Sequence, residues 1–199
     1  MAEDGKLKDA IQHRIQEHIN MFQKMQVDDV LMNSVETIAH SIVVSLQSGG
    51  RLLLCGNGGS ASDAQHIAAE FVGRFQKNRK PYDAEALNIN VSSLTAISND
   101  YGYEEVFARQ VEAKGRSGDI LIGFSTSGTS PNVVKALMQG KQIGMRTILF
   151  TGNHELMELQ DECDEILRIP STLAARIQEG HIWVGHMIAE LVEEELSKD

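Results

Sequence analysis

The chain has 199 residues, of which 42% are hydrophobic, and its formal net charge is −10. This length fits one compact domain, or one domain with an appended helical segment. The acidic balance, without a basic stripe, argues against nucleic acid as the main partner. We see no signal peptide and no apolar run near the ~20 residues of a membrane span, so we expect a cytoplasmic protein without a membrane partner. Two cysteines, Cys55 and Cys163, are too few for a disulfide framework.

Two amphipathic helices are predicted ahead of the first strand. Apolar residues recur at helical spacing over 4–26 and again over 28–48. We interpret 1–48 as an N-terminal helical pair and 49–199 as the main domain. The first helix lies outside any strand–helix repeat, so it packs either on its own subunit or against another subunit.

Strands and helices then alternate to the end of the chain. Strands are expected at 52–55, 86–89, 119–124, 146–151 and 165–169, and helical segments at 62–77, 92–97, 103–114, 131–143, 154–162 and 173–197. This alternation predicts a doubly wound α/β fold, with a five-stranded parallel sheet and helices on both faces. If the strand order is the flavodoxin-like 2-1-3-4-5, the loops after the first and third strands flank the crevice where ligands bind.

A glycine-rich loop, residues 56–62, follows the first strand and leads into a helix. Ser60, Ser62 and Asp63 are each suitable as the N-cap of that helix. Glycines let the backbone approach a ligand closely, and a helix N-terminus offers N–H groups and partial positive charge. The loop therefore suits an anion or a polar sugar.

A second loop, after the third strand, is rich in hydroxyl groups. Ser125, Ser127 and Ser130 precede Pro131, which fits the first position of the next helix. Hydroxyls and backbone N–H groups ahead of a helix can hold a phosphate without a basic side chain. The alternative is a turn whose hydroxyls only cap the helix. The loop lacks the Gly-Lys-Ser/Thr ending of a Walker motif.

Side chains suited to acid/base chemistry occur on two of the predicted helices. His66 and Glu70 are four residues apart and share a helix face, either as an ordinary exposed pair or as part of a site. On the last helix, Glu179 lies about 20° and Gln178 about 80° from His186 around the axis. Helix geometry therefore pairs Glu179 with His186, although periodicity does not decide which of the two faces a site.

Four segments carry a family resemblance: CGNGGSASDAQHIAAEFVGRF, ISNDYGYEEVFARQVEAKG, STSGTSPNVVKAL and ARIQEGHIWVGH. Together they resemble the sugar isomerase (SIS) domain family and, within it, the phosphoheptose isomerases. The resemblance extends over essentially the whole chain, and the motifs are specific in combination. It implies a cytoplasmic homotetramer with active sites between subunits. The order of the elements gives the same expectation, because the helix at 173–197 follows the last strand, at the far edge of the sheet, and one subunit would have difficulty bringing His186 to Glu70. The implied reaction converts sedoheptulose 7-phosphate to D-glycero-D-manno-heptose 7-phosphate, the first step towards ADP-heptose and the lipopolysaccharide core.

The resemblance also implies roles for residues at matching positions. Glu70 and His186 are the acid/base pair of an aldose–ketose isomerase. The implied substrate contacts are Asn57, Gly58, Gly59, Ser60, Glu70, Asn99, Asp100, Ser125, Thr126, Ser127, Ser130 and Gln178. In members that bind zinc, the implied ligands are His66, Glu70, Gln178 and His186, so the family prefers Gln178 over Glu179. Some members carry Asp just before the Arg of the RIQE motif, where this chain has Ala175.

Three other interpretations compete with this one. The chain could be a non-catalytic SIS tetramer that binds the replication initiator DnaA, but such a module has no need of Glu70, His186 and Asp100 together. It could be the sugar-phosphate-sensing part of a regulator, although no DNA-binding segment is present in its length or charge. It could also isomerise another ketose phosphate, because no motif reports the chain length or stereochemistry of the sugar.

Overall fold

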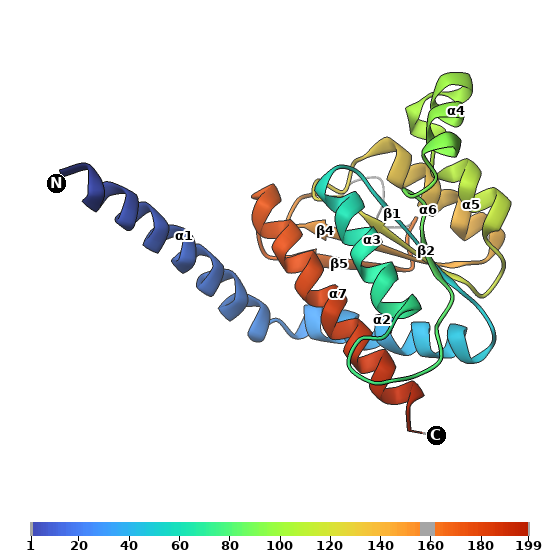
Figure 1. The fold of residues 1–199 in the computed structure, drawn as a ribbon, viewed down its shortest axis with the longest axis horizontal. Helices are drawn as coiled ribbons and strands as arrows, with labels where there is room; N and C mark the ends of the chain where they lie inside the picture. Colours follow the sequence, from blue (N-terminus) through green and yellow to red (C-terminus); the bar gives the residue numbers. More distant parts are fainter. Residues whose placement is uncertain (1, 156–161, 199) are drawn as a thin grey trace.

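A parallel β-sheet forms the centre of the molecule (Figure 1). The computed structural model describes residues 2–155 and 162–198, and within them the sheet has five strands in the order β2-β1-β3-β4-β5. The strands are β1 (Leu52–Gly56), β2 (Ala84–Ala86), β3 (Ile120–Phe124), β4 (Arg146–Gly152) and β5 (Glu165–Ile169). All four pairings are parallel, so the predicted 2-1-3-4-5 order is confirmed.

Helices cover both faces of this sheet. They are α1 (Ala2–Gln26), α2 (Asp29–Gln47), α3 (Gly59–Val72), α4 (Val91–Tyr101), the 3-10 helix η1 (Tyr103–Glu105), α5 (Ala108–Lys114), α6 (Pro131–Ile143) and α7 (Ala174–Leu196). Helices α2, α3 and α7 share one hydrophobic core with the sheet, and α5 and α6 share the other. Successive side chains of a strand point to opposite faces, and Leu54 and Cys55 of β1 accordingly belong to the first and the second core.

The N-terminal helix leaves an apolar surface uncovered. Most of α1 projects from the body as a rod (Figure 1), and its Leu7, Ile11 and Ile15 are 66%, 53% and 53% exposed. Where α1 meets α2 and α7, a groove of about 1340 Å³ is lined mostly by apolar side chains. Trp183 lies in it, edge-on to Phe22 with ring centroids 5.2 Å apart. None of the helices in the described part of the chain is long and apolar enough to cross a membrane.

Several predicted boundaries differ from the observed ones. The helix predicted over 62–77 begins at Gly59 and ends at Val72, because backbone N–H groups beyond Val72 bond to a side chain of α7 instead of continuing the helix. Its N-cap is Gly58, with φ +56° and no side-chain bond, and not one of the three polar residues expected there.

Other segments differ in length or position. The strand expected at 86–89 lies at Ala84–Ala86, the short turn expected at 92–97 is the longer α4, and the segment 103–114 divides into η1 and α5. Most of the helix expected at 154–162 lies outside the described residues.

Candidate functional site

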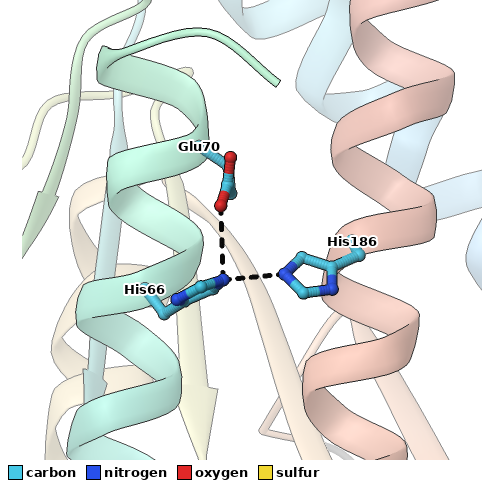
Figure 2. Close-up of side chains that lie close together, drawn as sticks. All are labelled: His66, Glu70 and His186. Carbon is cyan, nitrogen blue, oxygen red and sulfur yellow. Dashed lines mark hydrogen bonds and ion pairs between the residues drawn. The ribbon is translucent and has the colours of Figure 1, made fainter. Parts of the chain in front are cut away.

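His66, Glu70 and His186 lie together between α3 and α7 (Figure 2). The Nε2 atoms of His66 and His186 are 2.8 Å apart, and His66 Nε2 is 3.2 Å from a carboxylate oxygen of Glu70. One potential ligand atom from each residue lies within 4.8 Å of the other two. The His66 side chain is 51% exposed and that of Glu70 22%, so the cluster is open to solvent on one side.

The packing of α3 against α7 brings these side chains into contact. His66 and Glu70 share one face of α3 because they are four residues apart. Opposite them, Gly185 allows a close approach, since a Cβ there would lie 2.5 Å from Ile67 Cδ1. The ring of Phe75 lies against His186, with centroids 5.6 Å apart, and limits the orientation of that imidazole.

The cluster has the chemistry of both a proton-transfer site and a metal site. The two imidazole nitrogens are 2.8 Å apart and can form one hydrogen bond, in which the tautomers decide which ring is the donor. A carboxylate beside them can take or give a proton in turn. The same two nitrogens and one oxygen are donors that zinc accepts. The group can therefore hold a metal ion.

One expectation about this cluster is wrong. Because α7 follows the strand at the far edge of the sheet, His186 seemed unable to reach Glu70 of the same chain. In the structure α7 crosses back over the sheet and packs directly beside α3. A single chain therefore carries His66, Glu70 and His186 in contact.

Gln178 and Glu179 point to different neighbours. The amide of Gln178 lies over the start of α3, where a Cβ on Gly59 would be 2.5 Å from Gln178 Nε2. Glu179 instead pairs with His18 of α1 at 3.1 Å and with Arg176 at 3.2 Å. The pairing of Glu179 with His186 that helix geometry favoured is therefore wrong, because α1 takes up the Glu179 carboxylate.

Two residues that the sequence analysis missed, Asn132 and Tyr103, hold the glycine-rich loop through Asn57. Asn57 and Asn132 exchange a reciprocal pair of amide hydrogen bonds of 2.8 and 2.9 Å. Tyr103 donates a third bond of 3.0 Å to Asn57 Oδ1. Asn132 is 2% exposed and stands in the first turn of α6. Asn132 directly follows the serine-rich loop and Pro131, and this position at the start of a helix is the signal in the sequence that could have identified it.

The serine-rich loop leaves the sheet beside the glycine loop. Gly56 at the end of β1 pairs with Phe124 at the end of β3, so both loops start at the same edge. The Ser125 and Ser130 hydroxyls are 2.9 Å apart, and those of Ser127 and Thr129 are 3.0 Å apart. Because Ser130 makes no side-chain cap, the alternative of hydroxyls that only cap the helix does not describe Ser130.

The remaining residues predicted to contact substrate are not part of the cluster of His66, Glu70 and His186. Asn99 and Asp100 are exposed on α4, a helix that buries none of its residues, and their side chains bond to each other at 2.8 Å. Thr126 and Ser60 belong to the two loops, and Ser60 is buried. Ala175 is exposed in the first turn of α7.

Two titratable groups near the cluster have shifted pKa values. Burial raises the pKa of the Asp63 carboxyl to about 6, opposed by the nearby His66. His181 packs between Phe124 and Phe150 with ring centroids 5.8 Å from each. Burial lowers its pKa to about 4, so this imidazole is neutral at physiological pH.

Comparison with known proteins agrees with this architecture. Residues 16–152 match the model of the SIS domain family. A phosphoheptose isomerase of Burkholderia pseudomallei is 48% identical over 183 residues, which is 92% of each chain. The solved phosphoheptose isomerase of Neisseria gonorrhoeae is 37% identical with a TM-score of 0.87, covering 94% of this chain and 99% of that one. The corresponding structure from Francisella tularensis is 33% identical with the same TM-score, covering 94% and 97%. The chain therefore belongs to the SIS domain family and, within it, to the phosphoheptose isomerases.

Proposed function

We propose that this protein is a cytoplasmic isomerase that converts sedoheptulose 7-phosphate to D-glycero-D-manno-heptose 7-phosphate, the first step towards ADP-heptose and the lipopolysaccharide core. The observation that carries the proposal is the contact of His66 and Glu70 with His186 between α3 and α7. The similarity to phosphoheptose isomerases over nearly the whole chain supports the choice of substrate.

The reaction needs one base and one acid near C1 and C2 of the sugar. A base removes a proton from C1 of the ketose while an acid protonates the carbonyl oxygen at C2, which gives an enediol. Return of a proton to C2 and loss of the proton on the C1 oxygen complete the aldose. We assign these transfers to Glu70 and His186, because a carboxylate and an imidazole suit them and lie in one cluster.

The two loops are assigned to the rest of the substrate. We place the phosphate at the serine-rich loop, and the sugar at the glycine-rich loop with Asn99 and Asp100. The proposed phosphate contacts are Ser60, Ser125, Thr126, Ser127 and Ser130, and the sugar contacts are Asn57, Gly58, Gly59 and Gln178. The start of α6 favours an anion there. Phosphate binding away from the reacting carbons orients them for proton transfer.

Zinc is the cofactor that we propose for this site. His66, Glu70 and His186 offer ligand atoms that all lie within 4.8 Å of one another. Gln178 of α7, whose amide lies over the start of α3, is the proposed fourth ligand, through its amide oxygen. A bound zinc ion supplies Lewis-acid polarisation of the substrate oxygens.

We also propose a homotetramer, with the helical pair 1–48 at its interfaces and 49–199 as the SIS domain proper. The exposed apolar stripe of α1 and the groove between α1, α2 and α7 support self-association, because monomers rarely leave such large apolar surfaces uncovered. Asn99 and Asp100 are exposed on α4 and their side chains bond to each other, and we assign them to a site that two subunits share.

The proposed reaction is tested by incubating purified protein with sedoheptulose 7-phosphate and following the aldose product by NMR. We expect the heptose 7-phosphate with the manno configuration to accumulate until equilibrium. Parallel incubations with five- and six-carbon ketose phosphates test the competing sugar specificity. No conversion of the seven-carbon substrate, with or without added zinc, would contradict the proposal.

A further inference from the structure

A buried ion pair joins the two helices that carry the His66, Glu70 and His186 cluster. Arg79, in the segment after α3, meets Glu193 of α7 with its Nε 2.8 Å from Glu193 Oε1. The two side chains are only 7% and 2% exposed. A buried ion pair is by itself weak evidence that it stabilises the fold. We therefore consider what else the pair does between α3 and α7.

Arg79 binds the C-terminal end of α3. Its Nη2 donates to the carbonyl oxygen of Glu70 at 2.7 Å, and its Nη1 donates to that of Phe71 at 2.9 Å. Carbonyl groups in the last turn of a helix have no partner within the helix, so the guanidinium fixes the end of α3. One of these carbonyls belongs to Glu70, a member of the cluster.

Glu193 holds the chain that leaves α3. Its Oε2 accepts the backbone N–H groups of Gln76 and Lys77 at 2.7 and 2.8 Å, and its Oε1 accepts that of Phe75 at 3.1 Å. Burial raises the pKa of the Glu193 carboxyl, but these bonds and Arg79 outweigh burial and hold the pKa below its usual range. The group is therefore an anion at neutral pH.

Glu193 is connected to His186 in two ways, through α7 and through Phe75. Glu193 lies seven residues after His186, which places it about 20° away around α7 and two turns further along. Phe75, whose N–H is bound by Glu193, lies with its ring 5.6 Å from the His186 ring. Arg79 therefore binds the backbone of Glu70 on α3. Glu193 holds Phe75, the residue whose ring packs against His186 of α7.

We propose that Arg79 and Glu193 are positioning residues, which set α3 against α7 so that Glu70 and His66 meet His186 in the geometry that the reaction needs. The inference rests on the proposed isomerase function of that cluster. Both residues lie at the C-terminal end of α3, whereas the glycine-rich loop assigned to the sugar lies at its N-terminal end. Loss of the pair should therefore lower turnover while substrate binding is largely kept.

Two conservative variants test this inference in the full-length protein. Arg79→Lys keeps the charge but cannot make the set of bonds of a guanidinium, and Glu193→Gln replaces one accepting oxygen by an amide. We expect kcat to fall by about tenfold or more and KM to change by less than about threefold, which is the pattern for a lost transition-state geometry. Zinc affinity, measured by competition with a chromophoric chelator, should fall in both variants.

Two control variants separate positioning from general stability. Glu190→Gln alters a partly exposed carboxylate on the same helix, which accepts a bond from Gln76 Nε2 at 2.8 Å, and it should retain parental kcat. Leu137→Ala removes a buried side chain of α6 from the core on the opposite face of the sheet. It should lower the melting temperature while, below that temperature, it leaves kcat and zinc affinity near parental values.

The outcomes distinguish this inference from the proposed function. Failure of the parent protein to isomerise the sugar counts against the function, and the histidine ring signals in NMR then test the pair. Those signals should shift in Arg79→Lys and Glu193→Gln but not in Leu137→Ala. The inference is overturned if both variants lose stability as Leu137→Ala does but keep the parental kcat, zinc affinity and ring signals.

Discussion

Glu70 and His186 are the side chains on which the proposed chemistry depends. Glu70→Gln and His186→Ala should each lower kcat by ~10²-fold or more, the usual effect of losing a general acid or base. Both side chains lie at the surface of the α3–α7 contact and not in the core, so circular dichroism should be unchanged. Glu179→Gln is the matched control, because that carboxylate faces His18, and it should retain turnover.

Mixing these two variants tests where the cluster is assembled. Because one chain supplies His66, Glu70 and His186 together, a mixture of Glu70→Gln and His186→Ala chains should stay inactive after subunit exchange. Restored activity in the mixture, with exchange shown by mass spectrometry, would mean that Glu70 and His186 act from different chains.

His181 makes stability depend on pH. Its pKa is about 4 in the folded protein against 6.5 for a free histidine, so the unfolded chain binds more protons between these values. Stability from this residue is complete above pH 6.5 and is lost as the pH falls towards 4. His181 alone should lower the free energy of unfolding by about 2 kcal/mol from about pH 7 to about pH 5, whereas Asp63, whose pKa is raised in the folded protein, contributes in the opposite direction.

Urea unfolding at a series of pH values measures this dependence. His181→Leu cannot titrate at this position, so its free energy of unfolding should fall by about 2 kcal/mol less than that of the parent over the same range, although it has a different stability at neutral pH. A profile for this variant as steep as that of the parent would place the titrating group elsewhere.

At the scale of elements, the two ligand loops are joined through the contact of Asn57 with Asn132. Asn132→Ala leaves the Asn57 amide without its two bonds and frees the glycine-rich loop from the start of α6. We expect kcat/KM to fall by about tenfold or more, because buried polar groups lose their partners. Tyr103→Phe removes a single bond to Asn57 and should cost only a few-fold. Equal effects of the two variants would contradict this assignment.

Much of the element order was predictable, because periodicity reports it directly. The buried runs of β1 and β3 and the start of α6 at Pro131 follow from local sequence, and the parallel sheet follows from the alternation of strands and helices. The strand order does not follow from alternation and entered only as a condition. The end of α3 at Val72 was not predictable, since Glu193, more than a hundred residues away in sequence, accepts the N–H groups of the next segment. The choice between Gln178 and Glu179 likewise depended on His18 of α1, which no pattern on α7 itself reveals.

At the scale of the whole molecule, the projecting part of α1 is the feature that a lone chain leaves unexplained. Leu7→Glu and Ile11→Glu change side chains that are 66% and 53% exposed, so they should not destabilise the isolated fold. If this stripe is buried between subunits, each change should shift the protein from tetramer to smaller species in sedimentation analysis. Lys6→Glu, next to the stripe on a polar position, is the charge control and should remain assembled. An unchanged mass for all three variants would exclude this stripe from the interface.

The packing of α2 against the far end of the chain has a consequence for synthesis on the ribosome. Ser34 of α2 bonds to Glu165 of β5 at 2.7 Å across 131 residues of sequence, and α2 also packs against α7. The core around α5 and α6 has its helices once α6 is made, whereas the opposite core, which already has α2 and α3, still lacks α7. A nascent chain that stops short of α7 therefore leaves the apolar residues of α2, α3 and the sheet that α7 covers exposed to solvent. Those residues form the surface that a chaperone would meet while translation is still under way.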